Sequence, residues 1–445
     1  MKIKIPDEVG YIINTLEENG YEAYAVGGCV RDSLLGNHPT DWDICTSALP
    51  EQAMTVFSGQ RIVDTGSKYG TITLVLDHKP FEITTYRVDG DYSDHRRPDK
   101  VEFVSSLKED LARRDFTINA MAYNRKTGVI DFFGGLDDIH GVIRCVGEAG
   151  DRFQEDALRI MRALRFASRL GFSIEENTAN AMHEKRGLLN SISVERIAAE
   201  LNKFITGDNI AELLQAHKTI IMEIIPELAL MDGFDQNTPY HCYDVWTHTL
   251  MSMEYAPKEL AIRLVMLLHD IAKPQCYIEK EGTGRFPGHQ QVGSDMAGKI
   301  LRRLKYDNDT IDTVIRLILH HDDGIEPESK IVKRWLSRMG EHRLRLLIEV
   351  KRADALAQSE RYHDDKLAVL SGVVSLIDEI IKQRQCFTLK DLALDGDDLI
   401  EMGVREGAGI GIILNKLLDM VINEEAVNDK AILAEIARNL YKTLI

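Results

Sequence analysis

The chain lacks the features of secreted, membrane and disordered proteins. Its six cysteines, at positions 29, 45, 145, 242, 276 and 386, form no Cys-x-x-Cys pair, so we expect no disulfide framework and a reduced, cytoplasmic location. No stretch of 18 residues is both apolar and uncharged, and the start MKIKIPDEVG has no apolar signal segment; we therefore expect no membrane partner. Gly and Pro number only 32 and 11 of 445 residues, which excludes a fibrous chain.

Positive charge is also scarce. There are 54 Lys and Arg residues against 71 Asp and Glu, a formal net charge of −17, and such a chain repels nucleic acid as a whole. Residues 151–169 are an exception, with five arginines (152, 159, 162, 165, 169) against three acids (151, 155, 156). Any RNA contact is therefore expected to be local. The sequence indicates no protein partner.

The pattern along the chain predicts an α+β protein of several domains, since 445 residues exceed a single core. A helical pattern at 9–19 alternates with strand-like runs at 24–26, 41–45, 71–76 and 81–88, whereas from about residue 155 the pattern is almost entirely helical. We expect a small head with a mixed sheet at 1–145, followed by an elongated all-α part. Its predicted divisions are a neck at 146–235, a third domain at 236–360 and a tail at 361–445.

The strongest local signal in the head is a Gly-Gly turn followed by two spaced carboxylates. Asp41 and Asp43 are separated by one residue, so on a strand they share a face and could hold two divalent cations roughly 3.5–4 Å apart for attack on a phosphate. Gly27 and Gly28 let backbone N–H groups approach a triphosphate. A surface turn is the alternative for the carboxylate pair alone. Glu82, on a strand-like run, is a candidate third acid or a solvated strand residue.

Seven segments in order resemble the class II tRNA nucleotidyltransferase/poly(A) polymerase family of the polymerase-β superfamily, across about residues 20–200. The segments are GGCVRDSLLG (27–36), DWDICTSALP (41–50), FEITTYR (81–87), DGDYSDHRRPDKVEF (89–103), LARRDFTINAMAYN (111–124), DFFGG (131–135) and EDALRIMRALRFASRLGF (155–172). The resemblance implies a polymerase-β-like head that uses Mg²⁺. It also implies that residues 89–97 form a flexible loop associated with the switch from C to A addition, although an ordinary polar loop is the alternative.

The same resemblance implies roles for individual residues. Asp41 and Asp43 would be the magnesium ligands, and Gly28 and Arg31 would contact the nucleoside triphosphate. Three more residues would lie at the nucleotide, with the last two near its ribose: Arg114, Asp115 and Asn119. By itself, the pair at 113–114 also fits two solvated arginines.

The neck helix expected at 155–165 offers a means of choosing a base without a template. Asp156, Arg159, Arg162 and Arg165 are spaced by three, so neighbours share a face; a salt-bridged face is the alternative. Cytosine and adenine both present an amino donor beside a ring-nitrogen acceptor. An Asp acceptor with an Arg donor matches that pattern, and guanine and uracil leave both side chains wrongly paired at a cost of a few kcal/mol. The resemblance assigns this role to Asp156 and Arg159, and places Arg162 and Arg165 near the nucleotide.

A second constellation follows residue 236 and combines histidines with carboxylates. Nitrogen and oxygen donors without thiolates suit Mg²⁺ or a transition metal such as Mn, Fe, Co or Ni better than structural zinc. The series resembles the HD-domain superfamily of phosphohydrolases over about residues 240–360. That resemblance implies His248, His269, Asp270 and Asp354 as ligands of a first metal, with His289 and His320 available to a second. An HD fold retained as a scaffold is the alternative to a catalytic domain.

The tail resembles the tRNA-contacting region of the same nucleotidyltransferases, with glycines at 403–411 that could present N–H groups to a phosphate, or serve a helical packing element. Together these patterns predict addition of C, C and A to the tRNA 3′ end from CTP and ATP. A poly(A) polymerase, or an HD phosphohydrolase whose head only binds RNA, are the alternatives.

Overall fold

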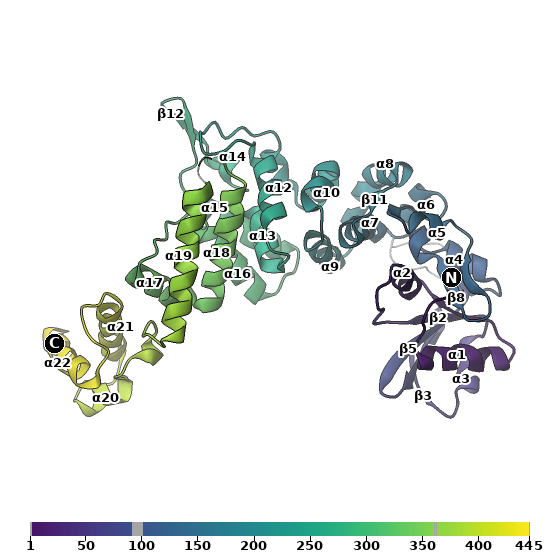
Figure 1. The fold of residues 1–445 in the computed structure, drawn as a ribbon, viewed down its shortest axis with the longest axis horizontal. Helices are drawn as coiled ribbons and strands as arrows, with labels where there is room; N and C mark the ends of the chain where they lie inside the picture. Colours follow the sequence, from purple (N-terminus) through teal and green to yellow (C-terminus); the bar gives the residue numbers. More distant parts are fainter. Residues whose placement is uncertain (1, 91–100, 360, 362, 445) are drawn as a thin grey trace. The chain divides into compact units, whose positions relative to one another are not determined.

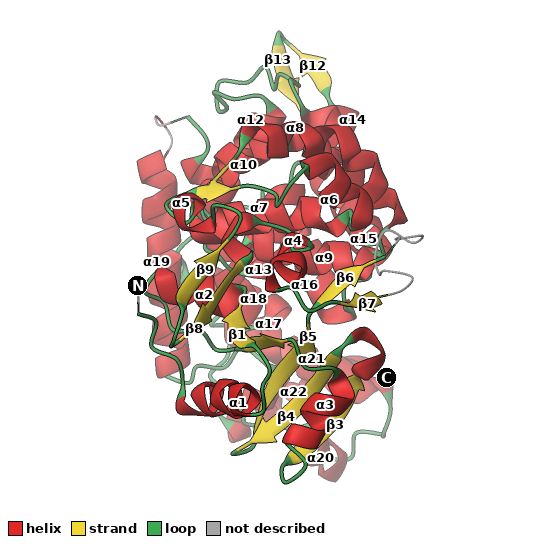
Figure 2. Ribbon diagram, turned by 90° about the vertical axis from the view of Figure 1, so that its right-hand side faces the viewer, coloured by secondary structure: helices red, strands yellow, loops and turns green. Residues whose placement is uncertain are grey.

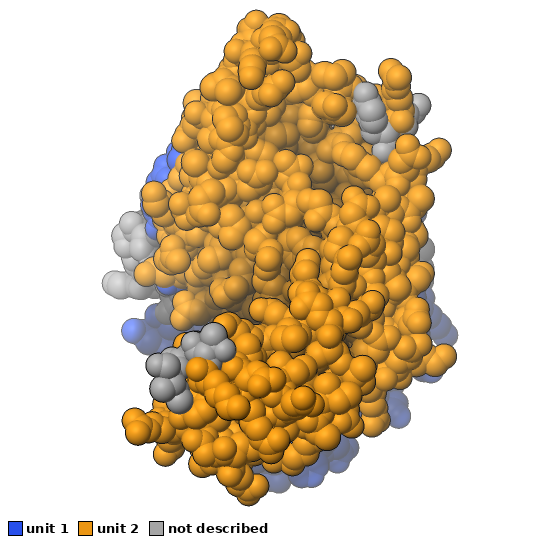
Figure 3. Space-filling model, turned by 90° about the vertical axis from the view of Figure 1, so that its left-hand side faces the viewer, with its two compact units in different colours: residues 1–226 blue, residues 227–445 orange. Residues whose placement is uncertain are grey.

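The computed structural model describes residues 2–90, 101–359, 361 and 363–444. They divide into two compact units, residues 1–226 and 227–445 (Figure 1, Figure 3). The first unit contains a mixed sheet with helices and the second is mostly helical, so the α+β fold class is confirmed. The finer division at residues 145, 235 and 360 stays a prediction. Within the described ranges, no helix is long and apolar enough to cross a membrane.

The head is built on a seven-stranded sheet with the order β3-β4-β5-β2-β1-β8-β9 (Figure 2). Strands β2 and β5 run parallel and place Asp43 opposite Glu82, whereas the other neighbours in this sheet are antiparallel. The strands are β1 (Ala23–Val26), β2 (Asp43–Thr46), β3 (Arg61–Gly66), β4 (Thr71–Leu76), β5 (Lys79–Thr85), β8 (Met121–Asn124) and β9 (Gly128–Asp131). Two further pairs are β6 (Arg87–Asp89) with β7 (Val101–Phe103), and β10 (Val142–Ile143) with β11 (Ser173–Ile174).

Short helices cover this sheet. Helix α1 buries Val9, Ile12, Ile13 and Leu16, the spacing of one helical face, and that face packs toward β1 and the helix α3. The helical elements of the head are α1 (Asp7–Glu18), α2 (Gly28–Leu34), α3 (Pro50–Val56), α4 (Leu107–Ala112) and α5 (Gly135–Asp138), with single 3₁₀ turns η1 (Ser67–Tyr69) and η2 (Thr117–Asn119).

The neck differs from the expected single helix. Asp156 has an extended backbone (φ −133°, ψ 100°) that ends α6, and its carboxylate accepts the N–H of Leu158, 3.1 Å away. This local bond competes with helix continuation, so α7 starts anew. Helix α7 buries Leu158, Met161 and Leu164, as its apolar stripe predicts. The elements are α6 (Ala149–Glu155), α7 (Leu158–Leu170), α8 (Glu176–Lys185), η3 (Arg186–Ser191), α9 (Val194–Ile205), α10 (Ile210–Ala216) and α11 (Lys218–Ile224).

In the second unit, α12, α16 and α18 pack against α13, whose sequence LAIRLVMLL is buried almost throughout. Residues 278–285 interrupt the helices with a β-hairpin, formed by β12 (Ile278–Lys280) and β13 (Thr283–Arg285). The helices of this part are η4 (Pro226–Met231), α12 (Val245–Tyr255), α13 (Leu260–Leu268), α14 (Lys273–Cys276), α15 (His289–Arg303), α16 (Asn308–His320), α17 (Ser329–Met339), α18 (Glu341–Leu356) and α19 (His363–Lys382).

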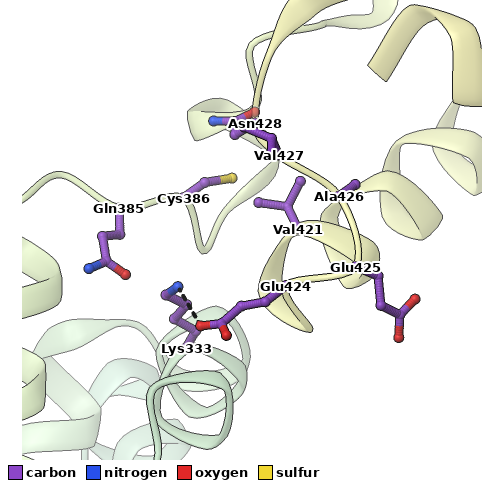
Figure 4. Close-up of a pocket in the computed structure, with 9 residues that line it drawn as sticks. All are labelled: Lys333, Gln385, Cys386, Val421, Glu424, Glu425, Ala426, Val427 and Asn428. Carbon is purple, nitrogen blue, oxygen red and sulfur yellow. Dashed lines mark ion pairs between the residues drawn. The ribbon is translucent and has the colours of Figure 1, made fainter. Parts of the chain in front are cut away.

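The tail has a small core of its own, which includes Leu394, Leu399 and Leu417. Where it meets α17, a pocket of about 380 Å³ is lined by Lys333 and by tail residues around Glu424 (Figure 4). The Nζ of Lys333 lies 3.9 Å from a carboxylate oxygen of Glu424. The tail elements are η6 (Leu389–Asp391), α20 (Gly396–Glu401), α21 (Ala408–Ile422) and α22 (Lys430–Leu444).

Candidate functional sites

The predicted acids of the head gather where β2 begins. Asp41 lies just before β2 and Asp43 begins it; both are exposed on either side of the buried Trp42, the pattern of two side chains on one face. Glu82 is the register partner of Asp43 on the parallel strand β5. Asp43, Glu82 and Arg114 line one pocket of about 200 Å³. Carboxylates converging at an open pocket are the donors that Mg²⁺ prefers, with the remaining positions left to phosphate or water.

The electrostatics of this pocket favour a cation. Partial loss of water raises the pKa of Asp43; Arg114 opposes this effect and the Asp41 carboxylate adds to it. A divalent ion between the two carboxylates would remove that repulsion, so these residues fit magnesium on their own chemistry.

The glycine turn before α2 makes room for Arg114. Gly27 has φ +82°, a backbone conformation that requires glycine, and a Cβ added there would lie 2.7 Å from an Nη of Arg114 and displace the end of that side chain. The buried Nε of Arg114 has no hydrogen-bond partner within the described part of the chain. Gly28 opens α2, and Arg31 lies on that helix. The guanidinium group of Arg114 therefore packs on the backbone of the turn that leads into α2.

A chain of polar contacts joins the head to the neck helix α7. Arg31 donates to the Asn119 side chain at 2.6 Å, and Asn119 donates to Asp115 at 3.0 Å. Asp115 in turn accepts from the Nε of Arg162 at 2.8 Å. Burial alone would raise the pKa of Asp115, but the Arg162 charge and the bonds from Asn119 and Arg162 hold it below its ordinary value. Arg165 pairs with Glu200 of α9 at 3.1 Å. Four predicted nucleotide residues thus form one network.

Asp156 and Arg159, the pair expected to recognise the base, are each hydrogen-bonded to other residues of the protein. The Asp156 carboxylate accepts from Arg196 of α9 at 3.1 Å. Arg159 is buried, donates to Glu155 at 2.7 Å and to the backbone carbonyl of Arg113 at 2.8 Å. Asp156 lies between two helices and not on the shared helix face that its spacing suggested, because the helix breaks there. Arg196 and Glu155 were missed by sequence reasoning; Arg196 is 40 residues away from Asp156 and leaves no local signal.

In the second unit, histidines from four helices converge around two carboxylates. Within the described ranges, two groups could hold a metal: His248, His269 and Asp354 form one, and Asp270, His289 and His321 form the other. His248 Nε2 lies 2.9 Å from Asp354, and His269 Nε2 lies 3.2 Å from Asp270. The two groups are adjacent, since that last distance joins His269 of the first group to Asp270 of the second.

The tautomers of these four rings suit metal binding. Each ring holds its Nδ1 at a backbone carbonyl, which leaves the Nε2 lone pair directed into the cluster. The Nδ1 contacts are His248 to Ala357 at 3.2 Å, His269 to Met266 at 2.9 Å, His289 to Phe286 at 2.9 Å and His321 to Ile318 at 2.6 Å. Both oxygens of the buried Asp270 lack a hydrogen bond in the described part of the chain, although Lys273 forms an ion pair with one at 2.7 Å. A divalent cation fits this donor set.

His320 does not join the cluster, and His321 takes the place predicted for it. His320 bonds Asp323 at 2.7 Å and packs edge-on against Trp335. The reason is helical phase: α16 buries Val314, Leu317 and Ile318, and residue 321 continues that buried stripe by spacings of seven, four and three. The apolar spacing was therefore a signal in the sequence that selects the second histidine of the pair.

The cluster of histidines and carboxylates opens into a pocket of about 980 Å³. Its walls include Asp270, His289 and His321 together with four cationic side chains, namely Lys273, Lys280, Arg285 and Lys366. Lys280 and Arg285 come from the β12–β13 hairpin, which the sequence had not revealed. The loop expected to switch C and A addition falls largely on residues 91–100, outside the described residues.

Comparisons with known proteins match the part of the chain that carries the acids and the part that carries the histidines to different domain families. Residues 23–144 match the Poly A polymerase head domain, 171–231 the probable RNA- and SrmB-binding site of polymerase A, and 238–359 the HD domain. The CCA-adding enzyme of Ligilactobacillus salivarius is 36% identical over 442 residues, covering 98% of each chain. That of Geobacillus kaustophilus is 51% identical over 204 residues, 46% of this chain and 50% of that protein.

A solved structure extends the similarity to the fold. The crystal structure of the Bacillus stearothermophilus CCA-adding enzyme in complex with CTP has a TM-score of 0.72 and 30% identity, covering 98% of both chains. Full-length identity above 30%, with matching head and RNA-binding regions, shows the family. The chain belongs to the CCA-adding enzymes, the tRNA nucleotidyltransferases.

Proposed function

We propose that this protein adds CMP and AMP, from CTP and ATP, to the 3′ end of tRNA. The observation that carries the proposal is the pocket that unites Asp43, Glu82 and Arg114 beside the glycine turn. In the reaction, a bond forms between the tRNA 3′-oxygen and the α-phosphorus, pyrophosphate leaves, and the hydroxyl proton is released. Free thiols at all six cysteines fit a reducing compartment, and we infer a cytoplasmic location.

Two magnesium ions would be held by Asp41 and Asp43, with Glu82 beside them, and would supply charge neutralisation at the reacting phosphate. The chain's own work is positioning and electrostatic stabilisation. Arg114 lines the same pocket as Asp43 and Glu82, so its positive charge would attract a phosphate bound there.

Choice of the base falls to Asp156 and Arg159. In the structure, Asp156 is hydrogen-bonded to Arg196 and Arg159 to Glu155, so neither charged group is unpaired before a base binds. A matching base can replace or share these contacts, whereas guanine or uracil would leave a buried carboxylate or guanidinium wrongly paired.

One assay tests this function against its nearest alternative. The full-length protein is incubated with tRNA lacking CCA, with tRNA ending in CC, and with an unrelated RNA, each with single nucleoside triphosphates. Addition limited to C, C and A on tRNA supports the proposal. A long A tract on any RNA identifies a poly(A) polymerase, and no incorporation refutes both. Asp43→Ala should abolish incorporation, and retained turnover would contradict its role as a metal ligand.

A second candidate function is hydrolysis of a phosphoester at the histidine cluster. It is favoured by the four Nε2 atoms aimed at Asp270 and Asp354, in a pocket that also carries Lys280 and Arg285. The cofactor there would be Mg²⁺ or a divalent transition metal. Full-length protein loaded with Mn²⁺, Co²⁺, Ni²⁺ or Mg²⁺ should release p-nitrophenol from p-nitrophenyl or bis-p-nitrophenyl phosphate, and Asp270→Asn should stop it. A metal-loaded protein that hydrolyses neither would be a scaffold.

A further inference from the structure

Three arginines from two parts of the first unit surround one aromatic ring. The guanidinium carbons of Arg31, Arg162 and Arg165 lie 5.0, 5.5 and 4.1 Å from the centroid of Phe166. Arg31 belongs to α2 of the head, whereas the other two belong to α7 together with Phe166. All three arginines were predicted to lie at the nucleotide, but sequence reasoning gave Phe166 no role.

Outer contacts alone do not explain why these cations gather. Arg31 is held by Asp32 and Asn119, Arg162 by Asp115, and Arg165 by Glu200. These acceptors lie on α2, η2, the segment before η2, and α9, so they anchor the guanidinium groups from different sides. Bringing three like charges toward one point is unfavourable, and the repulsion is visible at Arg165, whose pKa is lowered first by burial and then by the Arg162 charge.

The face of an aromatic ring supplies the missing attraction. Its quadrupole draws guanidinium groups, more strongly where water is excluded, and Phe166 is only 8% exposed. The ring is itself fixed by an edge-to-face contact with Phe116, with centroids 5.7 Å apart at 82°. Phe166 is therefore a buried, oriented platform between the glycine-turn helix of the head and the arginines of the neck.

We propose that Phe166 is a positioning residue for nucleotide selection, whose ring holds Arg31, Arg162 and Arg165 in the arrangement that receives the incoming CTP or ATP. The inference rests on the proposed function, because the arginines are assigned to the nucleotide there. It couples the head to the neck: loosening the ring frees both the Arg31 contact to Asn119 and the Arg162 contact to Asp115. Nucleotide affinity and discrimination then depend on a side chain that carries no polar group.

The test compares Phe166→Leu, Phe166→Met and Phe166→Tyr in the full-length protein. Leu and Met keep apolar volume but lose the ring face, and Tyr keeps the face. A matched control is Phe204→Leu on α9, a fully buried phenylalanine of the same unit that is not the ring on which these arginines stack. For each variant, kcat and KM for CTP and ATP, the ratio of correct to UTP and GTP incorporation, and the melting temperature are measured on tRNA lacking CCA.

Losing two to three cation–π contacts should raise KM for both nucleotides roughly tenfold in the Leu and Met variants, with kcat changed less than about threefold. Their discrimination against UTP and GTP should fall severalfold, and Phe166→Tyr should restore both. Phe204→Leu should lower the melting temperature without these changes. The proposal is overturned if Leu and Met variants keep wild-type KM and discrimination, if they behave like Phe204→Leu, or if Tyr fails as they do. A wild-type protein that adds no C or A would instead refute the proposed function.

Discussion

Substituting His320 and His321 one at a time should show which of the two binds a metal ion in the histidine cluster. His321 Nε2 lies 3.4 Å from His289 Nε2 and 3.8 Å from an oxygen of Asp270, whereas His320 is directed to Asp323. His321→Ala therefore reduces the second group from three donors to two. His320→Ala removes one partly exposed hydrogen bond and a ring contact with Trp335, and leaves the donor set unchanged.

The two variants should differ in metal affinity by a wide margin. Changing a residue that only supports a ligand costs 10- to 100-fold, so losing a ligand should cost at least about 100-fold, equivalent to about 2.7 kcal/mol. His320→Ala should lower the free energy of unfolding by about 1 kcal/mol, from the lost hydrogen bond, with metal affinity near that of the wild type.

Co²⁺ titration measures this difference, because the visible absorption of bound Co²⁺ reports its nitrogen ligands. Mg²⁺ is kept in excess to occupy the head, and urea unfolding of the metal-free proteins gives their stability. We expect His321→Ala to bind one Co²⁺ ion fewer per protein than the wild type, and His320→Ala to bind the same number as the wild type. Normal Co²⁺ binding by His321→Ala, or its loss in His320→Ala, would refute the helical-phase argument that places His321 in the cluster.

Three further outcomes follow from single contacts. Arg196→Met removes the 3.1 Å partner of Asp156 and should reduce discrimination of C and A against G and U roughly tenfold in single-nucleotide assays; unchanged discrimination would contradict it. Asp115 has a folded-state pKa below its unfolded value, so its stability contribution is present above about pH 4 and lost as pH falls below it. In urea unfolding, the gap between wild type and Asp115→Asn should therefore narrow on acidification. Gly27→Ala should cost about 1–3 kcal/mol and lower incorporation, since it forces Arg114 aside; a wild-type melting curve would count against this.

Local periodicity accounted for much of the fold. The helix near 9–19 was predictable because it buries one regular face. The strand at 71–76 was predictable because its sequence, TITLVL, is a short run of β-branched and apolar residues. The β12–β13 hairpin was not predictable, because its strands have only three residues each, five of the six are exposed or half-buried, and there is no apolar alternation. The helix break at Asp156 also escaped prediction, since it depends on a side-chain bond to Leu158 that competes with an otherwise helical sequence.

For the sites, residue types were predictable from motifs, whereas partners distant in sequence were not. Asp41, Asp43 and Glu82 could be named because parallel strands and alternation place them together. Arg196 and Glu200 could not, because nothing near Asp156 or Arg165 in the sequence identifies the helix that packs beside them. The roles of all these residues stay predictions until the variants are measured.

The arginine-rich stretch at 151–169 takes on a different meaning once its partners are known. Counted in sequence, it has five arginines against three acids and suggests a basic face for RNA. In the structure, four of the five arginines pair with carboxylates: 152 and 159 with Glu155, 162 with Asp115, and 165 with Glu200. Of the five arginines, only Arg169 is exposed. These cations are thus engaged in internal ion pairs, so under the proposed function we expect counterion release on tRNA binding to come mainly from charges elsewhere.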